Sequence, residues 1–124
     1  MIYADTDFFL ALLKKDDWLK NKAMDIYKKN KGRIWISPVT VIEMLLLAEE
    51  YKLDPERVVV DILEIAEVKD IDINILLLAS HLMKHEDVNV FDALHSSFCG
   101  GNKIISSDKV FDKLGLERIS LEKN

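Results

Sequence analysis

The chain has 124 residues, of which 49% are hydrophobic and 31% are charged, proportions that are typical of one ordinary globular domain. Its single cysteine, Cys99, cannot form an internal disulfide, which is typical of a reducing compartment. No apolar run reaches the ~18 residues of a membrane span, and no basic segment precedes an apolar one at the N-terminus. We therefore predict one domain over residues 1–124, located in the cytoplasm and without membrane contact.

Short apolar segments rich in β-branched and aromatic residues alternate with longer segments of helical periodicity. Strands are expected at residues 1–4, 33–37, 68–71, 103–106 and 117–119. Helices are expected at residues 6–14, between a cap at Asp16 or Asp17 and Gly32, and at residues 37–51, 54–67, 73–85, 90–99 and 109–114. Strands that are apolar throughout are typical of a parallel sheet covered on both faces. The pattern predicts a three-layer α/β/α domain with a central parallel sheet.

Two of the expected helices begin with a capping side chain followed by proline, at Ser37-Pro38 and at Asp54-Pro55. Apolar spacing predicts the buried faces, and Trp18 and Leu63 are both expected to point inward. The helices at 37–51 and 54–67 carry more apolar residues than one buried stripe uses. Part of that surface is therefore expected to pack against a second copy of the chain or another protein.

Four acidic residues lie within or beside apolar segments. Burying an ionised carboxylate costs several kcal/mol unless it is paired or binds a metal, and none has a Lys or Arg in helical register inside its own segment. Connectivity brings most of them to the carboxyl ends of the strands, where ligands bind in such sheets. We therefore predict that these four side chains share divalent cations: Asp5, Glu43, Asp92 and Asp108.

A site made of carboxylate oxygens favours a hard cation, Mg²⁺ or Mn²⁺, over zinc. Metal ions held in this way can promote phosphodiester hydrolysis. Simpler roles also fit the same residues. Asp5 and Asp108 could each cap the helix that follows, Asp92 could interact with a helix dipole, and Glu43 could be an ordinary paired acid. His95, one turn after Asp92, either contacts the site or fills the core.

The positive charge of the chain is concentrated between Lys14 and Arg33. This segment holds eight basic and three acidic residues, although the whole chain has a net charge of −5. Such asymmetry favours a polyanionic ligand, whereas a lysine-rich helix face in solvent is the simpler explanation. Four lysines are candidate RNA contacts: Lys14, Lys15, Lys28 and Lys29.

Four short motifs resemble those of the PIN-domain family of metal-dependent ribonucleases, most closely the VapC-type toxins. They are Ile2-Tyr3-Ala4-Asp5-Thr6, Ile36–Glu43, Asp92-Ala93-Leu94-His95 and Ile104–Phe111, in which Ser106 stands for the usual Thr. The family usually has Asn or Ser where this chain has Asp7, so Asp7 is either an additional ligand or exposed. Thr6, Asp7 and Ser106 are the expected supporting residues.

The resemblance implies a PIN-like fold, an acidic Mg²⁺ or Mn²⁺ site, endonucleolytic cleavage of RNA, a homodimer and a cognate antitoxin protein. Two alternatives remain open. Asp5-Thr6-Asp7 also fits the Asp-x-Asp of a haloacid-dehalogenase-type phosphatase, with Asp5 as nucleophile. The chain could also be a non-catalytic PIN-like module that binds RNA or protein.

Overall fold

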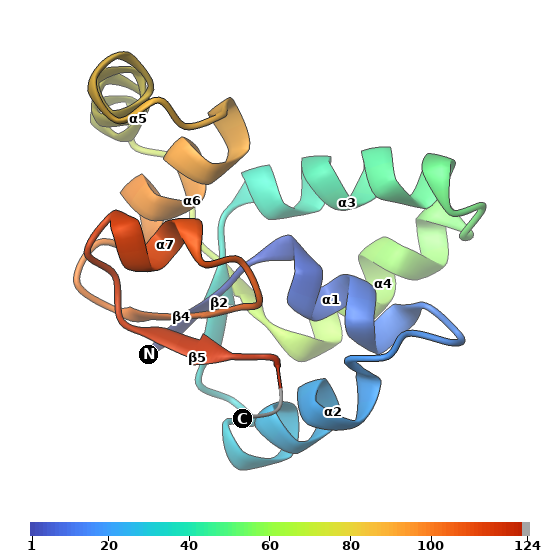
Figure 1. Ribbon diagram of the computed structural model, residues 1–124. Helices are drawn as coiled ribbons and strands as arrows, with labels where there is room; N and C mark the ends of the chain where they lie inside the picture. Colours follow the sequence, from blue (N-terminus) through green and yellow to red (C-terminus); the bar gives the residue numbers. More distant parts are fainter. Residues whose placement is uncertain (123–124) are drawn as a thin grey trace.

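The computed structural model describes residues 1–122, and its centre is a parallel sheet of five strands in the order β3-β2-β1-β4-β5. All four strand pairs are parallel, with Tyr3 opposite Trp35 on one side and Ile104 on the other. This confirms the predicted fold class (Figure 1). The strands are β1 (Ile2–Ala4), β2 (Ile34–Ile36), β3 (Glu67–Val68), β4 (Lys103–Ser106) and β5 (Arg118–Ser120).

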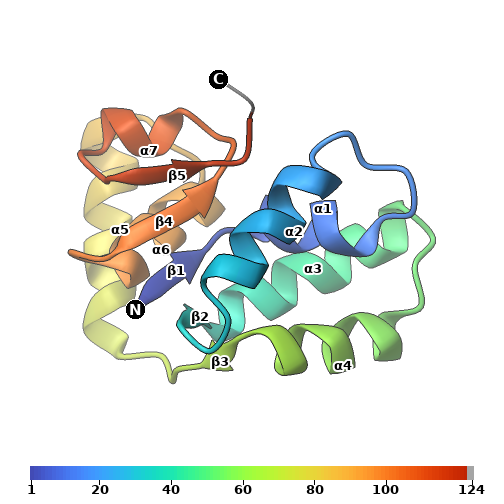
Figure 2. The same cartoon turned by 90° about the horizontal axis from the view of Figure 1, so that it is seen from below.

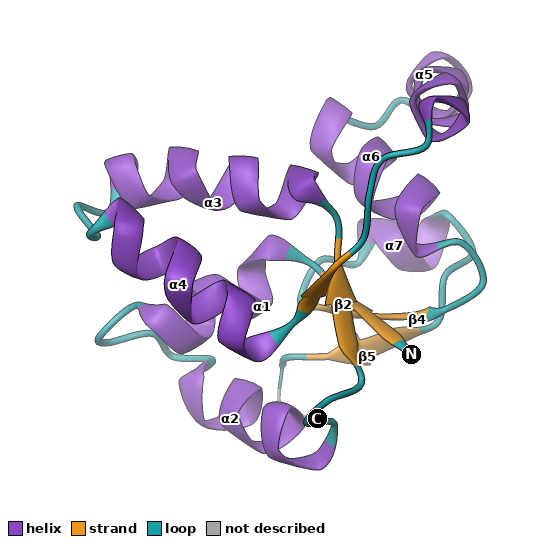
Figure 3. Ribbon diagram, turned by 180° about the vertical axis from the view of Figure 1, so that it is seen from behind, coloured by secondary structure: helices purple, strands orange, loops and turns teal. Residues whose placement is uncertain are grey.

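Helices cover both faces of this sheet (Figures 1 and 3). The helices are α1 (Thr6–Leu13), α2 (Lys20–Lys29), α3 (Pro38–Glu50), α4 (Pro55–Ile65), α5 (Ile73–Glu86), α6 (Val90–Cys99) and α7 (Val110–Lys113). Ile2 and Ala4 pack into the core formed with α1 to α4, whereas Tyr3 packs with α6 and α7, because successive side chains of a strand point to opposite faces. Helix α5 packs on α6 at the outer edge of the molecule (Figure 2).

Several local expectations are wrong in detail. Helix α2 begins at Lys20, because Asp17 Oδ1 accepts a hydrogen bond from Leu19 N in a turn before the helix. Trp18 lies in that turn with 77% of its surface exposed, and Leu63 is 56% exposed on α4, so neither points inward. The third strand is shorter than residues 68–71, the last strand is Arg118–Ser120, and the last helix begins at Val110.

The two predicted proline-containing helix starts differ. Asp54 caps α4, since its side chain accepts hydrogen bonds from Glu56 N and Arg57 N. Ser37 precedes α3 but forms no side-chain cap, because its hydroxyl lies 3.1 Å from the hydroxyl of Tyr3 instead. Among residues 1–122, no helix has both the length and the apolar character that a bilayer crossing requires.

Candidate functional site

The candidate site lies where β1 ends, at the centre of the sheet. β1 is flanked by β2 and β4, and the chain order of the strands reverses around it. Such a reversal leaves a crevice beyond the carboxyl ends of the strands. Asp5 directly follows β1, Ser106 ends β4, and Ser37 links β2 to α3. These segments, far apart in sequence, therefore meet at one edge.

Asp5 is held by hydrogen bonds to both of its carboxylate oxygens. Oδ1 accepts from Thr6 N at 2.7 Å and lies 3.2 Å from the Thr6 hydroxyl, while Oδ2 accepts from the Ser106 hydroxyl at 2.8 Å. Only 7% of Asp5 is exposed. Asp5 therefore both caps α1 and belongs to the site, so these two readings are compatible.

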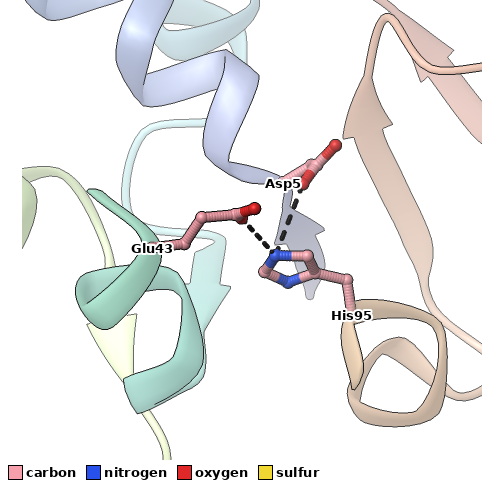
Figure 4. Close-up of side chains that lie close together, drawn as sticks. All are labelled: Asp5, Glu43 and His95. Carbon is pink, nitrogen blue, oxygen red and sulfur yellow. Dashed lines mark hydrogen bonds and ion pairs between the residues drawn. The ribbon is translucent and has the colours of Figure 1, made fainter. Parts of the chain in front are cut away.

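Glu43 and His95 face Asp5 from two helices (Figure 4). Glu43, in the second turn of α3, accepts a hydrogen bond from the Thr6 hydroxyl at Oε1. His95 Nε2 lies 2.9 Å from the same Oε1 and 3.5 Å from Asp5 Oδ1. One ligand atom from each of the three residues lies within 4.8 Å of the others. Of the two roles considered for His95, the structure supports contact with the site.

Behind His95 lies a buried group of hydroxyls. Tyr3 Oη is 2.7 Å from His95 Nδ1, 3.1 Å from Ser37 Oγ and 3.3 Å from Thr40 Oγ1. The sequence analysis did not identify Tyr3, Ser37 or Thr40 as site residues. Their only sequence signal is that Tyr3 and Ser37 each sit at a strand segment that leads to a predicted acid, and this pattern is too common to be specific.

Asp92 and Asp108 lie on the more open side of the site. Asp92, in the first turn of α6, is partly buried and Asp108 is exposed. Burial raises the pKa of Asp92 to about 6, and the charges of Asp108, Asp5 and Glu43 contribute to this rise. Asp108 Oδ1 also accepts a hydrogen bond from Val110 N, as a capping residue does. The structure thus places Asp92 within reach of the charges of Asp5, Glu43 and Asp108, but of the four predicted acids only Asp5 and Glu43 belong, with His95, to the group of ligand atoms within 4.8 Å of one another among the described residues.

Asp7 is neither exposed nor free. Its Oδ2 accepts hydrogen bonds from Ser107 N at 2.8 Å and from the Ser107 hydroxyl, which ties α1 to the segment that carries Asp108. Its Oδ1 is buried without a hydrogen-bond partner among the described residues. Burial raises the pKa of Asp7 to about 7, and the neighbouring charge of Asp5 adds to this effect.

Arg118 supports the same segment from β5 and was also missed by the sequence analysis. Its Nη1 donates to the carbonyl of Ser106 at 3.1 Å, while Nε and Nη2 donate to the carboxylate of Asp112. Three of its donors are therefore engaged, and the carboxyl end of β4 is fixed in place. A lone arginine in a strand gives no sequence signal of this role.

The electrostatics of the site fit a divalent cation. Burial raises the pKa of Asp5, even though His95 and the hydrogen bond from Ser106 lower it. Burial lowers the pKa of His95, but the hydrogen bond with Glu43 and the charges of Asp5 and Glu43 outweigh it, so the net pKa is raised. Carboxylates that lie close enough to repel one another are stabilised by a shared cation. Their oxygen donors suit Mg²⁺ or Mn²⁺.

The predicted RNA-contacting lysines lie elsewhere. Lys14 Nζ is 3.9 Å from Asp17 Oδ2 and 4.3 Å from the centre of the Tyr51 ring. Lys28 and Lys29 are exposed in the last turn of α2, which leads into the start of β2 (Figure 2). They therefore lie toward the amino ends of the strands, away from the acidic edge. The structure does not bring them together with the four acids.

Comparisons with known proteins agree with this architecture. The sequence model of the PIN domain matches residues 2–116. No curated protein matches the chain. Among solved structures, VapC20 from Mycobacterium tuberculosis, titled a sarcin-ricin loop cleaving toxin, aligns with a TM-score of 0.84 and 17% identity over 97% of this chain and 99% of that one.

Two further solved structures share the fold. A toxin–antitoxin complex from Klebsiella pneumoniae aligns with a TM-score of 0.76 and 16% identity over 100% of both chains. DNA-bound VapBC from Salmonella typhimurium aligns with a TM-score of 0.73 and 18% identity over 98% of both chains. Because these sequence identities are low, the similarity to the solved structures establishes the fold and nothing more.

Proposed function

Because the chain belongs to the PIN-domain family, we propose that it is a metal-dependent endoribonuclease and the toxin of a type II toxin–antitoxin pair. The observation that carries this proposal is the cluster at the carboxyl end of β1, where Asp5, Glu43 and His95 place ligand atoms within 4.8 Å of one another and the charges of Asp5, Glu43 and Asp108 act on Asp92. Burial raises the pKa of Asp5, Asp7 and Asp92, and perturbed carboxylates gathered at one place are typical of a catalytic site rather than of a structural core.

In this proposal the four acids hold Mg²⁺ or Mn²⁺. The bound ion would polarise a phosphoryl oxygen of the RNA and lower the pKa of a coordinated water. The chain itself supplies orientation. Thr6 and Ser106 fix the two oxygens of Asp5, and Asp7 holds the segment of Asp108 through Ser107. Preorganised ligands of this kind need little rearrangement when charge develops in the reaction.

The test is cleavage of a panel of structured RNAs, including a sarcin-ricin loop, by the purified protein in Mg²⁺, in Mn²⁺ and in EDTA. We expect internal cleavage with either metal and none in EDTA. A phosphate monoester is assayed in parallel, because a haloacid-dehalogenase-type phosphatase would hydrolyse the monoester and leave RNA intact. Binding of RNA without cleavage would instead support the non-catalytic module.

The proposed partner is a cognate antitoxin. By their titles, one of the similar solved structures is a toxin–antitoxin complex and another is a DNA-bound VapBC, and this chain presents an acidic edge that a basic side chain could enter. We expect such a side chain to compete with the metal for the carboxylates. Co-expression with the neighbouring gene should yield a complex that binds Mn²⁺ more weakly than the free protein does. A complex that binds Mn²⁺ equally well would contradict this mode of inhibition.

The protein is also proposed to form a homodimer, and α5 is the surface that best supports this. Ala79 is its only buried residue, while Ile73 and Leu77, one turn apart, are 72% and 71% exposed. The expected apolar excess on α3 and α4 is present in part, because Met44 and Val58 are buried there but Leu45, Leu46 and Val60 are exposed. A two-fold axis beside α5 would bury its apolar face against itself.

Sedimentation at micromolar concentration tests the dimer. Leu77→Lys on α5 should give monomers, whereas Leu63→Lys, an equally drastic change at an exposed leucine of α4, should leave the dimer intact. A parent protein that sediments as a monomer would contradict the homodimer.

A further inference from the structure

Tyr3 lies next to the acidic site and forms no hydrogen bond with an acid among the described residues. It occupies the middle of β1 and is fully buried, as are Ser37 and Thr40, and His95 is 1% exposed. A phenylalanine would fill the same space and would need no polar partners. The tyrosine instead brings one hydroxyl within 2.7 to 3.3 Å of three buried polar side chains. Buried hydroxyls are costly unless they are bonded, so this arrangement indicates a task for the hydroxyl.

The two ring nitrogens of His95 face different environments. Nδ1 faces Tyr3 Oη at 2.7 Å, while Nε2 faces Glu43 Oε1 at 2.9 Å and Asp5 Oδ1 at 3.5 Å. Despite burial, the neighbouring carboxylates raise the pKa of His95, but a cation bound by them would compensate their charge and favour the neutral imidazole, which carries one N–H. When Tyr3 donates to Nδ1, the hydrogen must be on Nε2, where it is donated to the carboxylates. The opposite tautomer would aim a lone pair at carboxylate oxygens.

We propose that Tyr3 is a positioning residue of the acidic site. It keeps the N–H of His95 on Nε2, so that His95 orients the carboxylates of Glu43 and Asp5 and does not itself bind the metal. Ser37 and Thr40 hold the Tyr3 hydroxyl in place. The inference rests on the proposed function, because it concerns a site that holds a divalent cation. It excludes a site in which Asp5, Glu43 and His95 are joint ligands, since Nε2 would then need a free lone pair.

Binding of Mn²⁺, measured from the signal of the free ion by electron paramagnetic resonance, tests the proposal without an activity assay. Tyr3→Phe should weaken binding about three- to tenfold, less than the usual effect of removing a direct partner of a metal ligand, because Tyr3 acts on the ligands through His95. Tyr27→Phe is the matched control. It removes the same atom from a partly buried tyrosine of α2, in the opposite core, and should bind Mn²⁺ like the parent. A Tyr3→Phe variant that binds like the parent would overturn the proposal.

The position of the proton is a second readout. The chain has three histidines, so His81→Gln together with His85→Gln leaves His95 as the only imidazole for ¹⁵N NMR. In Mg²⁺ at pH 8 we expect Nε2 to be protonated in this background. Adding Tyr3→Phe should lower the protonated fraction of Nε2. An unprotonated Nε2 in the background protein would overturn the proposal and would identify His95 as a ligand.

If Tyr3→Phe does not fold, two substitutions of His95 decide the question. The amide of His95→Gln can still donate to Glu43, whereas His95→Leu cannot. We expect the Gln variant to bind Mn²⁺ at least about tenfold more tightly than the Leu variant. Equal affinities would overturn the proposal. A parent protein that binds no Mn²⁺ contradicts the proposed function instead, and the NMR result on Nε2 then decides the role of Tyr3 alone.

Discussion

The two charged regions of this molecule are held in opposite ways. At the carboxyl edge of the sheet, Asp5, Asp7 and Glu43 are buried or partly buried, and each accepts hydrogen bonds from named donors. On α2, Lys28 and Lys29 are exposed at the opposite edge. Burying a charge costs free energy and requires partners that hold the charged group in place. An exposed charge costs little and needs no such partners.

The acids and the lysines should therefore contribute to function in different ways. Each acid holds a negative charge at one fixed position, so an isosteric change that removes this charge should have a large effect. The lysines contribute only to the total field felt by a polyanion, so changes there should be small and additive.

The largest effect is expected from Asp5→Asn and Asp92→Asn. Each should lower RNA cleavage by about a hundredfold or more, as does the loss of a group that stabilises the reacting charges in other hydrolases. Both variants should remain folded, because removing one charge from a crowded site relieves repulsion. The measurement is the initial cleavage rate in Mn²⁺, with circular dichroism to verify the fold. Asp25→Asn, the same change at an exposed position of α2, should cut like the parent. Undiminished cleavage by both site variants would show that the site is elsewhere.

The same contrast explains what the sequence could predict. Asp5, Glu43, Asp92 and Asp108 were identifiable because each interrupts or follows an apolar segment, and β–α alternation indicated the edge where they meet. The partners that hold them were not identifiable. Tyr3 and Ser37 looked like ordinary strand and cap residues, and the hydrogen bond between Tyr3 and His95 spans 92 positions. The predictions that Trp18 and Leu63 point inward were wrong for another reason. Helical spacing alone does not show which face of a helix the rest of the chain covers.

A smaller, pH-dependent effect is expected from Asp7→Asn. The pKa of Asp7 is raised from 3.8 to about 7 by burial and by the charge of Asp5. The folded state therefore holds a proton that the unfolded state has already released between these pH values. Stability of the metal-free protein should fall as the pH rises through that interval, and Asp7→Asn should abolish this loss. The difference in unfolding free energy should be small near pH 4 and reach a few kcal/mol above pH 7.

Thermal unfolding in EDTA between pH 4 and pH 8 measures this difference. Asn keeps an oxygen that can accept from Ser107, so the tether between α1 and the Asp108 segment should survive. Asp16→Asn, at an exposed position after α1, is the matched control and should show no such pH dependence. An Asp7→Asn variant that is less stable than the parent at pH 8 would mean that the charge of Asp7 is required to hold Ser107.

The smallest effect is expected from reversing the charges of Lys28 and Lys29. RNA binding is measured in the Asp92→Asn background, in which RNA cleavage should be strongly reduced, so that affinity is separated from cleavage. Each phosphate contact that is lost should flatten the dependence of log affinity on log salt by about 0.7 for single-stranded RNA. These lysines lie at the edge of the sheet opposite the acids. The double variant Lys28→Glu with Lys29→Glu should therefore flatten that slope by less than the loss of one phosphate contact would. Lys14→Glu with Lys15→Glu, in the segment that directly follows α1, is the comparison pair. If the first pair flattens the slope by at least the amount expected for one phosphate contact, the RNA path runs along α2, as the charge pattern of the sequence suggested. Such a result would also show that exposed charge far from the acids guides the substrate.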